Sequence, residues 1–261
     1  MTLNIPLKDN KKLAEVLARV NKNIELNTYI KCSNIMAVDR MNLNDHGPVH
    51  IAIVSNIALK LLRNLEKAGI EPSLLKDHPD KGFTQHDAEV LVLLAAALHD
   101  VGHIVTREDH HIYSLPIARD LMKSLLEGLY DDEQKYIIIS DVLHAIYSHH
   151  KDSDVETIEG GIIRISDALD MEEGRAMIPF KAGSISIHAV SAMAIDDVRI
   201  NYTQAKPISI EIVMNNSAGI FQIDYLLKSK ITGSRLEKYV EVKASTTGKT
   251  EKRIIDSVKL F

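Results

Sequence analysis

The sequence has only one cysteine, Cys32, among its 261 residues. No intrachain disulfide can form, so nothing indicates an oxidising compartment. Long apolar runs are also absent: a spanning helix needs about 20 apolar residues, and the run at residues 90–98 is far shorter. Residues 1–4 lack the basic and then apolar pattern of a secretory signal. We therefore expect a cytoplasmic protein that does not bind a membrane.

An excess of charge of one sign is missing as well. The chain carries 31 basic and 36 acidic residues, a formal net charge of -5, and the signs alternate along the sequence. This pattern argues against a nucleic-acid-binding surface and against a polybasic membrane surface. We expect a small-molecule partner, and a homo-oligomer is compatible with the sequence. Internal repeats and low-complexity segments are not found.

The spacing of apolar residues divides the chain into two parts. From about residue 11 to 176 these residues recur with helical spacing. Later the pattern changes to short β-branched runs bounded by turn residues. The expected later helices are at 108–127, 132–150 and 159–173; the expected strands are at 184–190, 197–202, 208–214 and 238–244, with a helix at 218–229. The sequence thus predicts a mainly α protein, with an all-helical domain over residues 1–180 and a smaller α+β domain over 181–261.

Local signals refine three of these elements. Thr84, followed by an acid at Asp87, is typical of a helix N-cap. Pro116 predicts a kink or a late start in the helix at 108–127. Residues 215–219 favour a turn and an N-cap over a backbone site for an anion.

The most informative residues are His99 and Asp100, which end the apolar run that starts at Leu93. A buried carboxylate costs several kcal/mol unless it is paired or ligates a cation. A metal ion is the expected partner, and more ligands must come from elsewhere. Most of the 12 histidines lie in short clusters that separate helices could bring together. These clusters are His46 with His50, His99 with His103, His110 with His111, and His149 with His150.

Over about residues 40–176, the order of these clusters resembles the order of the motifs in the HD-domain metal-dependent phosphohydrolases. The segments that carry the resemblance are His50 with Ala58, His99-Asp100-Val101-Gly102, His110 with Ser114, Ile146 to His150, and Ile165 to Asp170. It implies one ion held by His50, His99, Asp100 and Asp167, and a second held by Asp100, His110, His149 and His150. Asp100 would bridge them, and a hydroxide between the ions would attack the phosphate.

The doubled His149-His150 resembles the two-metal HD-GYP branch, but two departures set the chain apart. Where that branch has a lysine after the HD pair, this chain has His103, and the GYP signature is replaced by residues 151–155. Cyclic di-GMP is therefore a weak substrate prediction. His103 could orient a phosphate or protonate a leaving oxygen. His46 occupies a place where some relatives supply an extra ligand, which leaves a third metal site open.

Several nearby residues are weaker candidates. Arg107, Arg164 and Arg175 could bind the substrate phosphate, although structural pairing is an alternative for each. His111 is expected to be a neighbour of the ligands. His144 is expected to have a core or surface position.

The resulting hypothesis is a phosphohydrolase that cleaves a nucleotide, a cyclic nucleotide or a related phosphate ester. Its cofactors would be two divalent metal ions. Iron or manganese is expected, and zinc, nickel, cobalt and magnesium are alternatives. One rival is an HD-domain di-iron oxygenase with nearly the same ligands. Another is a non-catalytic regulatory module with structural metals. The role of the C-terminal domain is open among sensing, dimerisation and covering the cleft.

Overall fold

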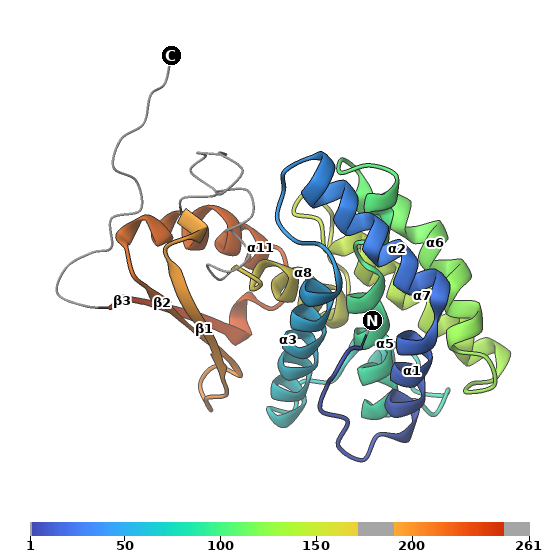
Figure 1. Cartoon of the computed structure of the whole chain (residues 1–261). Helices are drawn as coiled ribbons and strands as arrows, with labels where there is room; N and C mark the ends of the chain where they lie inside the picture. Colours follow the sequence, from blue (N-terminus) through green and yellow to red (C-terminus); the bar gives the residue numbers. More distant parts are fainter. Residues whose placement is uncertain (1, 172–190, 248–261) are drawn as a thin grey trace.

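The computed structural model describes residues 2–171 and 191–247, and it confirms the mainly α fold. Helices form the first part, and a three-stranded sheet with short helical segments forms the second (Figure 1). The first part comprises α1 (Lys11–Lys22), α2 (Ile24–Asn34), η1 (Ile35–Arg40), α3 (Pro48–Lys67), α4 (Ser73–Asp77), α5 (Gln85–Leu98), η2 (Val101–Ile104), α6 (His110–Leu125), α7 (Asp132–Ser148) and α8 (Ile158–Ala168).

Helix α5 lies at the centre of the core. Every side chain from Asp87 to Leu98 is buried, because α1, α3, α7 and α8 pack around this helix. Its composition is apolar on all faces, as expected for a central helix. The capping box predicted from Thr84 and Asp87 is confirmed. The apolar run that ends at His99 and Asp100 is therefore the central helix of the helical domain. These two residues directly follow its last turn.

Two helix predictions need correction. Helix α6 begins at His110 and continues through Pro116, so the alternative of a late start is wrong. Helix α8 ends at Ala168 rather than near residue 173. Two residues later, the carboxylate of Asp170 lies 2.6 Å from the Nδ1 of His50. Helix α7 ends at Ser148, so His149 and His150 follow the helix.

The sheet has the order β1-β2-β3, with β1 (Ile195–Asn201), β2 (Ile208–Met214) and β3 (Val240–Thr246). Strands β1 and β2 are antiparallel, whereas β2 and β3 are parallel. A parallel pair needs a crossover, which here contains η3 (Ser217–Gly219), η4 (Gln222–Leu227) and α11 (Lys228–Ile231), and η5 (Glu237–Tyr239) precedes β3. The three strands are within two residues of their predicted bounds, and Asn216 provides the expected cap. The strand at 184–190, the domain boundary at 180/181 and Arg175 lie outside the described residues.

The C-terminal part packs against the helical part through α8. Segments η4 and α11 contact α8, and β2 contacts α3. Figure 1 shows α11 beside α8. Gly161 on α8 permits a close approach, because a Cβ at this position would clash with the carbonyl oxygen of Ser234. The two parts are therefore joined by direct backbone contact beside the segment that carries Asp167.

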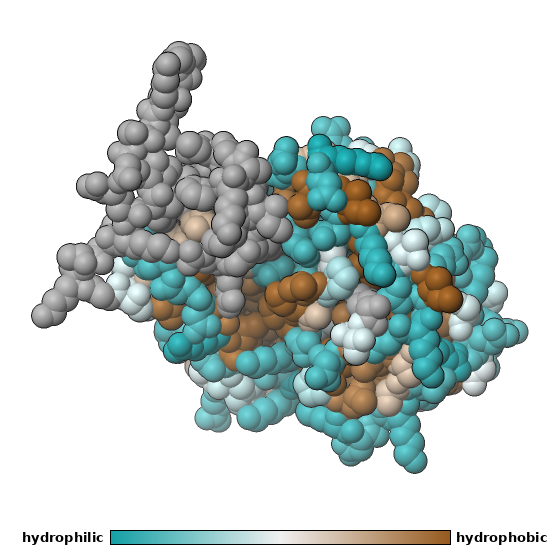
Figure 2. All heavy atoms as spheres, in the orientation of Figure 1, coloured by the Kyte–Doolittle hydropathy of each residue, from teal (hydrophilic) through white to brown (hydrophobic). Residues whose placement is uncertain are grey.

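The visible surface is mainly hydrophilic. In Figure 2 hydrophilic side chains predominate over the helical part, and hydrophobic ones form small patches between them. None of the helices in residues 2–171 and 191–247 has both the length and the apolar composition needed to cross a membrane.

A half-buried carboxyl on α3, that of Glu66, gives a test of the packing. Burial, together with the nearby charge of Glu89, raises the pKa of Glu66 from 4.5 to about 7. Its Oε1 has no hydrogen-bond partner among the described residues. A raised folded-state pKa contributes stability that is present below pH 4.5 and is lost as the pH rises through 7.

We therefore expect Glu66→Gln to stabilise the protein at pH 8 by about 1 kcal/mol, after allowance for solvent screening, and to have little effect at pH 4.5. Urea denaturation at the two pH values measures the difference. The matched control is Glu71→Gln, at an exposed position. An equal effect of Glu66→Gln at both pH values would contradict the argument.

Candidate metal centre

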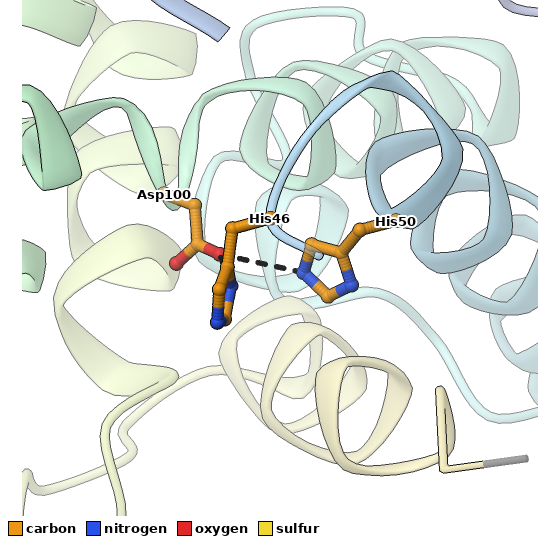
Figure 3. Close-up of side chains that lie close together, drawn as sticks. All are labelled: His46, His50 and Asp100. Carbon is orange, nitrogen blue, oxygen red and sulfur yellow. Dashed lines mark hydrogen bonds and ion pairs between the residues drawn. The ribbon is translucent and has the colours of Figure 1, made fainter. Parts of the chain in front are cut away.

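Eight of the predicted side chains converge in the helical domain. Their ligand atoms form four overlapping groups, and within each group the atoms lie within 4.8 Å of one another. The members are His46, His50, His99, Asp100, His103, His110, His149 and Asp167. Figure 3 shows how His46 and His50 approach Asp100 from neighbouring segments. All but Asp167, which is half-buried, are buried, so the cluster is a polar core rather than a surface patch.

Helix ends explain how distant segments reach one point. His50 lies in the first turn of α3, and His110 is the first residue of α6. His99 and His149 directly follow α5 and α7, and Asp167 is in the last turn of α8. Because each helix begins or ends at the cluster, its side chains can point inward while the rest of the helix packs in the apolar core.

The two oxygens of Asp100 face two different sets of imidazoles. Around Oδ2 lie His46 Nδ1 at 2.8 Å, His50 Nε2 at 3.4 Å and His99 Nε2 at 3.5 Å. Around Oδ1 lie His110 Nε2 at 3.3 Å, His103 Nε2 at 3.5 Å and His149 Nε2 at 3.8 Å. Asp167 joins the first set, with its Oδ1 at 3.6 Å from His50 Nε2 and 3.8 Å from His99 Nε2.

Hydrogen bonds on the far side of the rings fix which nitrogen faces the cluster. Three Nδ1 atoms point to backbone carbonyls: His99 to Ala96 at 2.9 Å, His110 to Arg107 at 2.9 Å and His149 to Ile146 at 2.5 Å. The Nδ1 of His50 faces the Asp170 carboxylate. Because a carbonyl can only accept, the Nδ1 atoms of His99, His110 and His149 carry protons, so that in the neutral form of each ring the Nε2 lone pair faces the centre.

These lone pairs face each other at short range. The Nε2 atoms of His50 and His99 are 3.2 Å apart, and those of His110 and His149 are 3.0 Å apart. Two lone pairs at this distance repel unless a shared proton or a metal cation lies between them. Ligands at about 2.1 Å from one ion, and at right angles, are about 3 Å apart. The donor set of imidazoles and carboxylates therefore fits divalent metal ions of the manganese-to-zinc series.

Burial and neighbouring charges shift the pKa values of the same residues toward the protonation states that bind metal. Burial opposes ionisation of Asp100, but the charges of His99, His103 and His46 outweigh it and hold its pKa well below its usual range. Burial, reinforced by neighbouring His99 and His110, holds the pKa of His149 well below its usual range. At neutral pH the carboxylate is thus charged and the imidazole of His149 neutral, which are the states that metal ligation requires.

The structure does not bring His150 into the cluster. Its side chain is 33% exposed and stacks on His111, with ring centroids 4.3 Å apart. The predicted ligand thus lies at the rim, and a position beside Asp100 Oδ1 is taken by His103 instead. His111 lies beside His110 and His150, outside the ligand groups, which agrees with its expected place as a neighbour.

His103 and Arg107 lie together at the edge of the cluster. The Nη1 of Arg107 is 3.1 Å from the Nε2 of His103, so the arginine donates and the proton of a neutral His103 is on Nδ1. That Nδ1 is buried and has no hydrogen-bond partner among the described residues. The ring also stacks on His110, with centroids 4.2 Å apart.

Arg164 does not have the predicted substrate-binding position. It is 2% exposed, and its Nε donates to the carbonyl oxygen of Ser148 at 2.8 Å. Its Nη2 donates to the carbonyls of His150 and Ser153. The guanidinium holds the end of α7 and the loop that follows it, so these donors serve the backbone, as in the structural alternative. His144 also has a structural position, with its Nε2 at 3.1 Å from Ser148 Oγ.

Sequence reasoning missed Lys230, which comes from α11 in the C-terminal part. Its Nζ donates to the carbonyl oxygen of His149 at 2.6 Å and lies 3.3 Å from Asp167 Oδ2. It is half-buried, with a side chain 17% exposed. No motif surrounds this lysine, so no local signal in the sequence could have placed it at the cluster.

Ser114 holds the turn that carries the HD pair. Its Oγ donates to the carbonyl oxygen of His99 at 2.7 Å and accepts from the Gly102 N–H at 2.8 Å. Gly102 is required at this contact, because a Cβ there would clash with the backbone carbonyl of His110.

We expect Ser114→Ala to destabilise the protein by about 1–3 kcal/mol, since it leaves a buried N–H and a buried carbonyl unsatisfied. Chemical denaturation measures the loss. The control is Ser124→Ala, whose hydroxyl bonds only to the carbonyl of Leu121 in its own helix. Equal effects of the two substitutions would argue against a special role of the turn.

Comparison with known proteins agrees with this geometry. A family model described as "HD domain" matches residues 49–172, a range that contains seven of the eight cluster residues and excludes His46. The uncharacterized protein MJ1020 of Methanocaldococcus jannaschii is 44% identical over 239 residues, which cover 92% of this chain and 90% of that protein. No solved structure matches the chain.

Proposed function

The chain belongs to the HD domain family, and we propose that it is a phosphohydrolase that uses two divalent metal ions to cleave a phosphate ester. One observation carries the proposal: each oxygen of Asp100 faces its own set of imidazoles. A carboxylate in that position can bridge two ions a few ångströms apart, which is the arrangement of two-metal hydrolytic sites.

The ligand roles follow from the distances. His50, His99 and Asp167 would hold one ion with Oδ2 of Asp100, and His110 and His149 would hold the other with Oδ1. When bound, such a pair of ions lowers the pKa of water and neutralises charge on a phosphate. His46 would orient Asp100 through its Nδ1, 2.8 Å from Oδ2. Asp170 would fix the ring of His50.

We assign the substrate phosphate to the side of the cluster where His103 and Arg107 lie. Arginine presents a planar set of donors that matches phosphate oxygens. Arg107 is half-buried, and the buried Nδ1 of His103 provides an N–H with no other partner among the described residues. The two side chains would position the phosphate and supply a hydrogen bond to its leaving oxygen.

The finer proposals follow from the same chemistry. A nucleotide, a cyclic nucleotide or a related ester is the proposed substrate, and iron or manganese the proposed metal, because imidazoles with carboxylates suit both ions. A small-molecule partner, a cytoplasmic location and a homo-oligomer remain proposals.

Metal analysis followed by a phosphate-release screen tests the function. Protein stripped with a chelator is reloaded separately with iron, manganese, zinc, nickel, cobalt or magnesium and is tested on nucleotides, cyclic nucleotides and cyclic dinucleotides. We expect release only after reloading. The control is His86→Ala, which removes an exposed imidazole and should not alter activity. Iron-dependent oxygen consumption without phosphate release would overturn the proposal and favour the oxygenase class.

A further inference from the structure

We propose that a cavity between α3 and β1 is a second ligand site, separate from the metal centre, which binds a nucleotide through its phosphates. The cavity has a volume of about 620 Å³, within the range of about 300–1,000 Å³ typical of small-molecule sites. The titratable side chains that line it are all basic: Lys8, Lys60, Arg63 and Arg199.

Two of these cations are available for a ligand. Neither Lys8 nor Lys60 forms an ion pair within the described part of the chain, and both are exposed. Arg199 pairs with Asp197, but both side chains are well exposed, so solvent weakens this pair. Lysines and an arginine on opposite walls of one cavity attract a ligand with several negative charges.

Two buried donors on the same wall lack acceptors. The Nε of Arg63 donates to Glu89 Oε1 at 2.6 Å, whereas its Nη2 is buried with no hydrogen-bond partner in the described residues. The Nδ2 of Asn64 is also buried and has no hydrogen-bond partner among the described residues. Unpartnered buried donors are costly. A small movement of these side chains toward phosphate oxygens in the cavity would satisfy both.

The rest of the lining suits the other half of a nucleotide. Ile57, Val198 and Ile200 provide an apolar surface, and the amides of Asn56 and Asn201 provide donors and acceptors beside it. A flat heterocycle with polar edges matches such a lining. The cavity therefore combines an apolar end with a cluster of cations, which is the chemistry of a nucleoside polyphosphate.

The position of the cavity separates it from the metal cluster. None of the cluster residues lines it, and Lys60 lies about 15 Å beyond His50 along the axis of α3 at 1.5 Å per residue. A smaller adjoining cavity of about 350 Å³ shares Asn56, Ile57 and Val198 with it and extends to Asp170. The smaller cavity thus reaches the residue that contacts His50, and neither cavity is lined by a residue of the metal cluster.

Calorimetric titration with ATP, and with tripolyphosphate alone, tests the proposal. The titrations use chelator-treated wild-type protein and the Asp100→Ala variant, which is expected to hold no metal. We expect both proteins to bind ATP at one site, and Lys60→Glu and Arg199→Glu to weaken that binding by about tenfold or more. The matched control is Lys123→Glu, an equal charge change at an exposed position on α6.

The outcomes separate this proposal from the proposed function. Absence of ATP binding to the chelator-treated wild-type protein would overturn the second site, as would affinities unchanged by both charge reversals. ATP binding that is lost only in Lys60→Glu and Arg199→Glu would support it, and thermal unfolding verifies that these variants are folded. Because no metal takes part in the titrations, failure to detect phosphate release would not affect the result.

Discussion

Replacing Asp100 with alanine is expected to abolish both metal binding and phosphate release. No other described side chain has two oxygens that each face a separate set of imidazoles. Its removal takes one ligand from each proposed ion and the negative charge that offsets both. Asp167 would then be the one carboxylate left among the cluster residues, so less negative charge would offset two bound cations. Metal content per chain and phosphate release measure the two losses.

A second variant separates loss of charge from loss of volume. Asp100→Asn keeps the shape but replaces one oxygen with an NH₂ group, which cannot ligate a metal. We expect its metal content to fall nearly as far as that of the alanine variant. The His86→Ala variant should retain the wild-type metal content. If Asp100→Asn kept two ions per chain, the bridging role of this carboxylate would be wrong.

The ligands that could be predicted from the sequence are those at helix ends. His99 and Asp100 end an apolar run, and such a run fixes both the helix and its burial. The order of the histidine clusters carried the resemblance to the HD-domain proteins, and that resemblance implied which segments meet. His150 could not be predicted in the same way, because two adjacent residues after a helix point in different directions. His149 turns into the cluster, whereas His150 stacks on His111.

The roles that the sequence left open concern side chains whose partners are set by tertiary structure. Arg164 lies one turn from Asp167, and the spacing was compatible with a role at the phosphate. The last residue of α7 and the loop that follows, however, present three carbonyls to the guanidinium. The local sequence does not indicate which side chains a loop will contact after the chain has folded. For the sheet, alternation predicted the three described strands, but the parallel pairing of β2 with β3 depends on a long crossover.

The same crossover supplies Lys230, and Lys230→Met is expected to weaken metal binding. The ammonium group links two ligand segments, since it contacts the Asp167 carboxylate on one side and the His149 carbonyl on the other. With Lys230 present, its charge and that of His99 outweigh burial and hold the pKa of Asp167 well below its usual range. Methionine preserves the length and apolar stem of the side chain but removes the charge and the donors.

Partners of metal ligands typically contribute 10–100-fold, so we expect Lys230→Met to lower metal affinity or phosphate release by roughly that factor. Competition with a chromophoric chelator gives the affinity. Lys230→Arg should restore part of it, because the charge is retained, whereas a purely structural role of the stem would not distinguish Arg from Met. The control is Lys228→Met, on the same segment, where the lysine pairs with Asp224 and both side chains are about 70% exposed. Unchanged affinity in Lys230→Met would mean that the C-terminal part packs beside the metal centre without contributing to it.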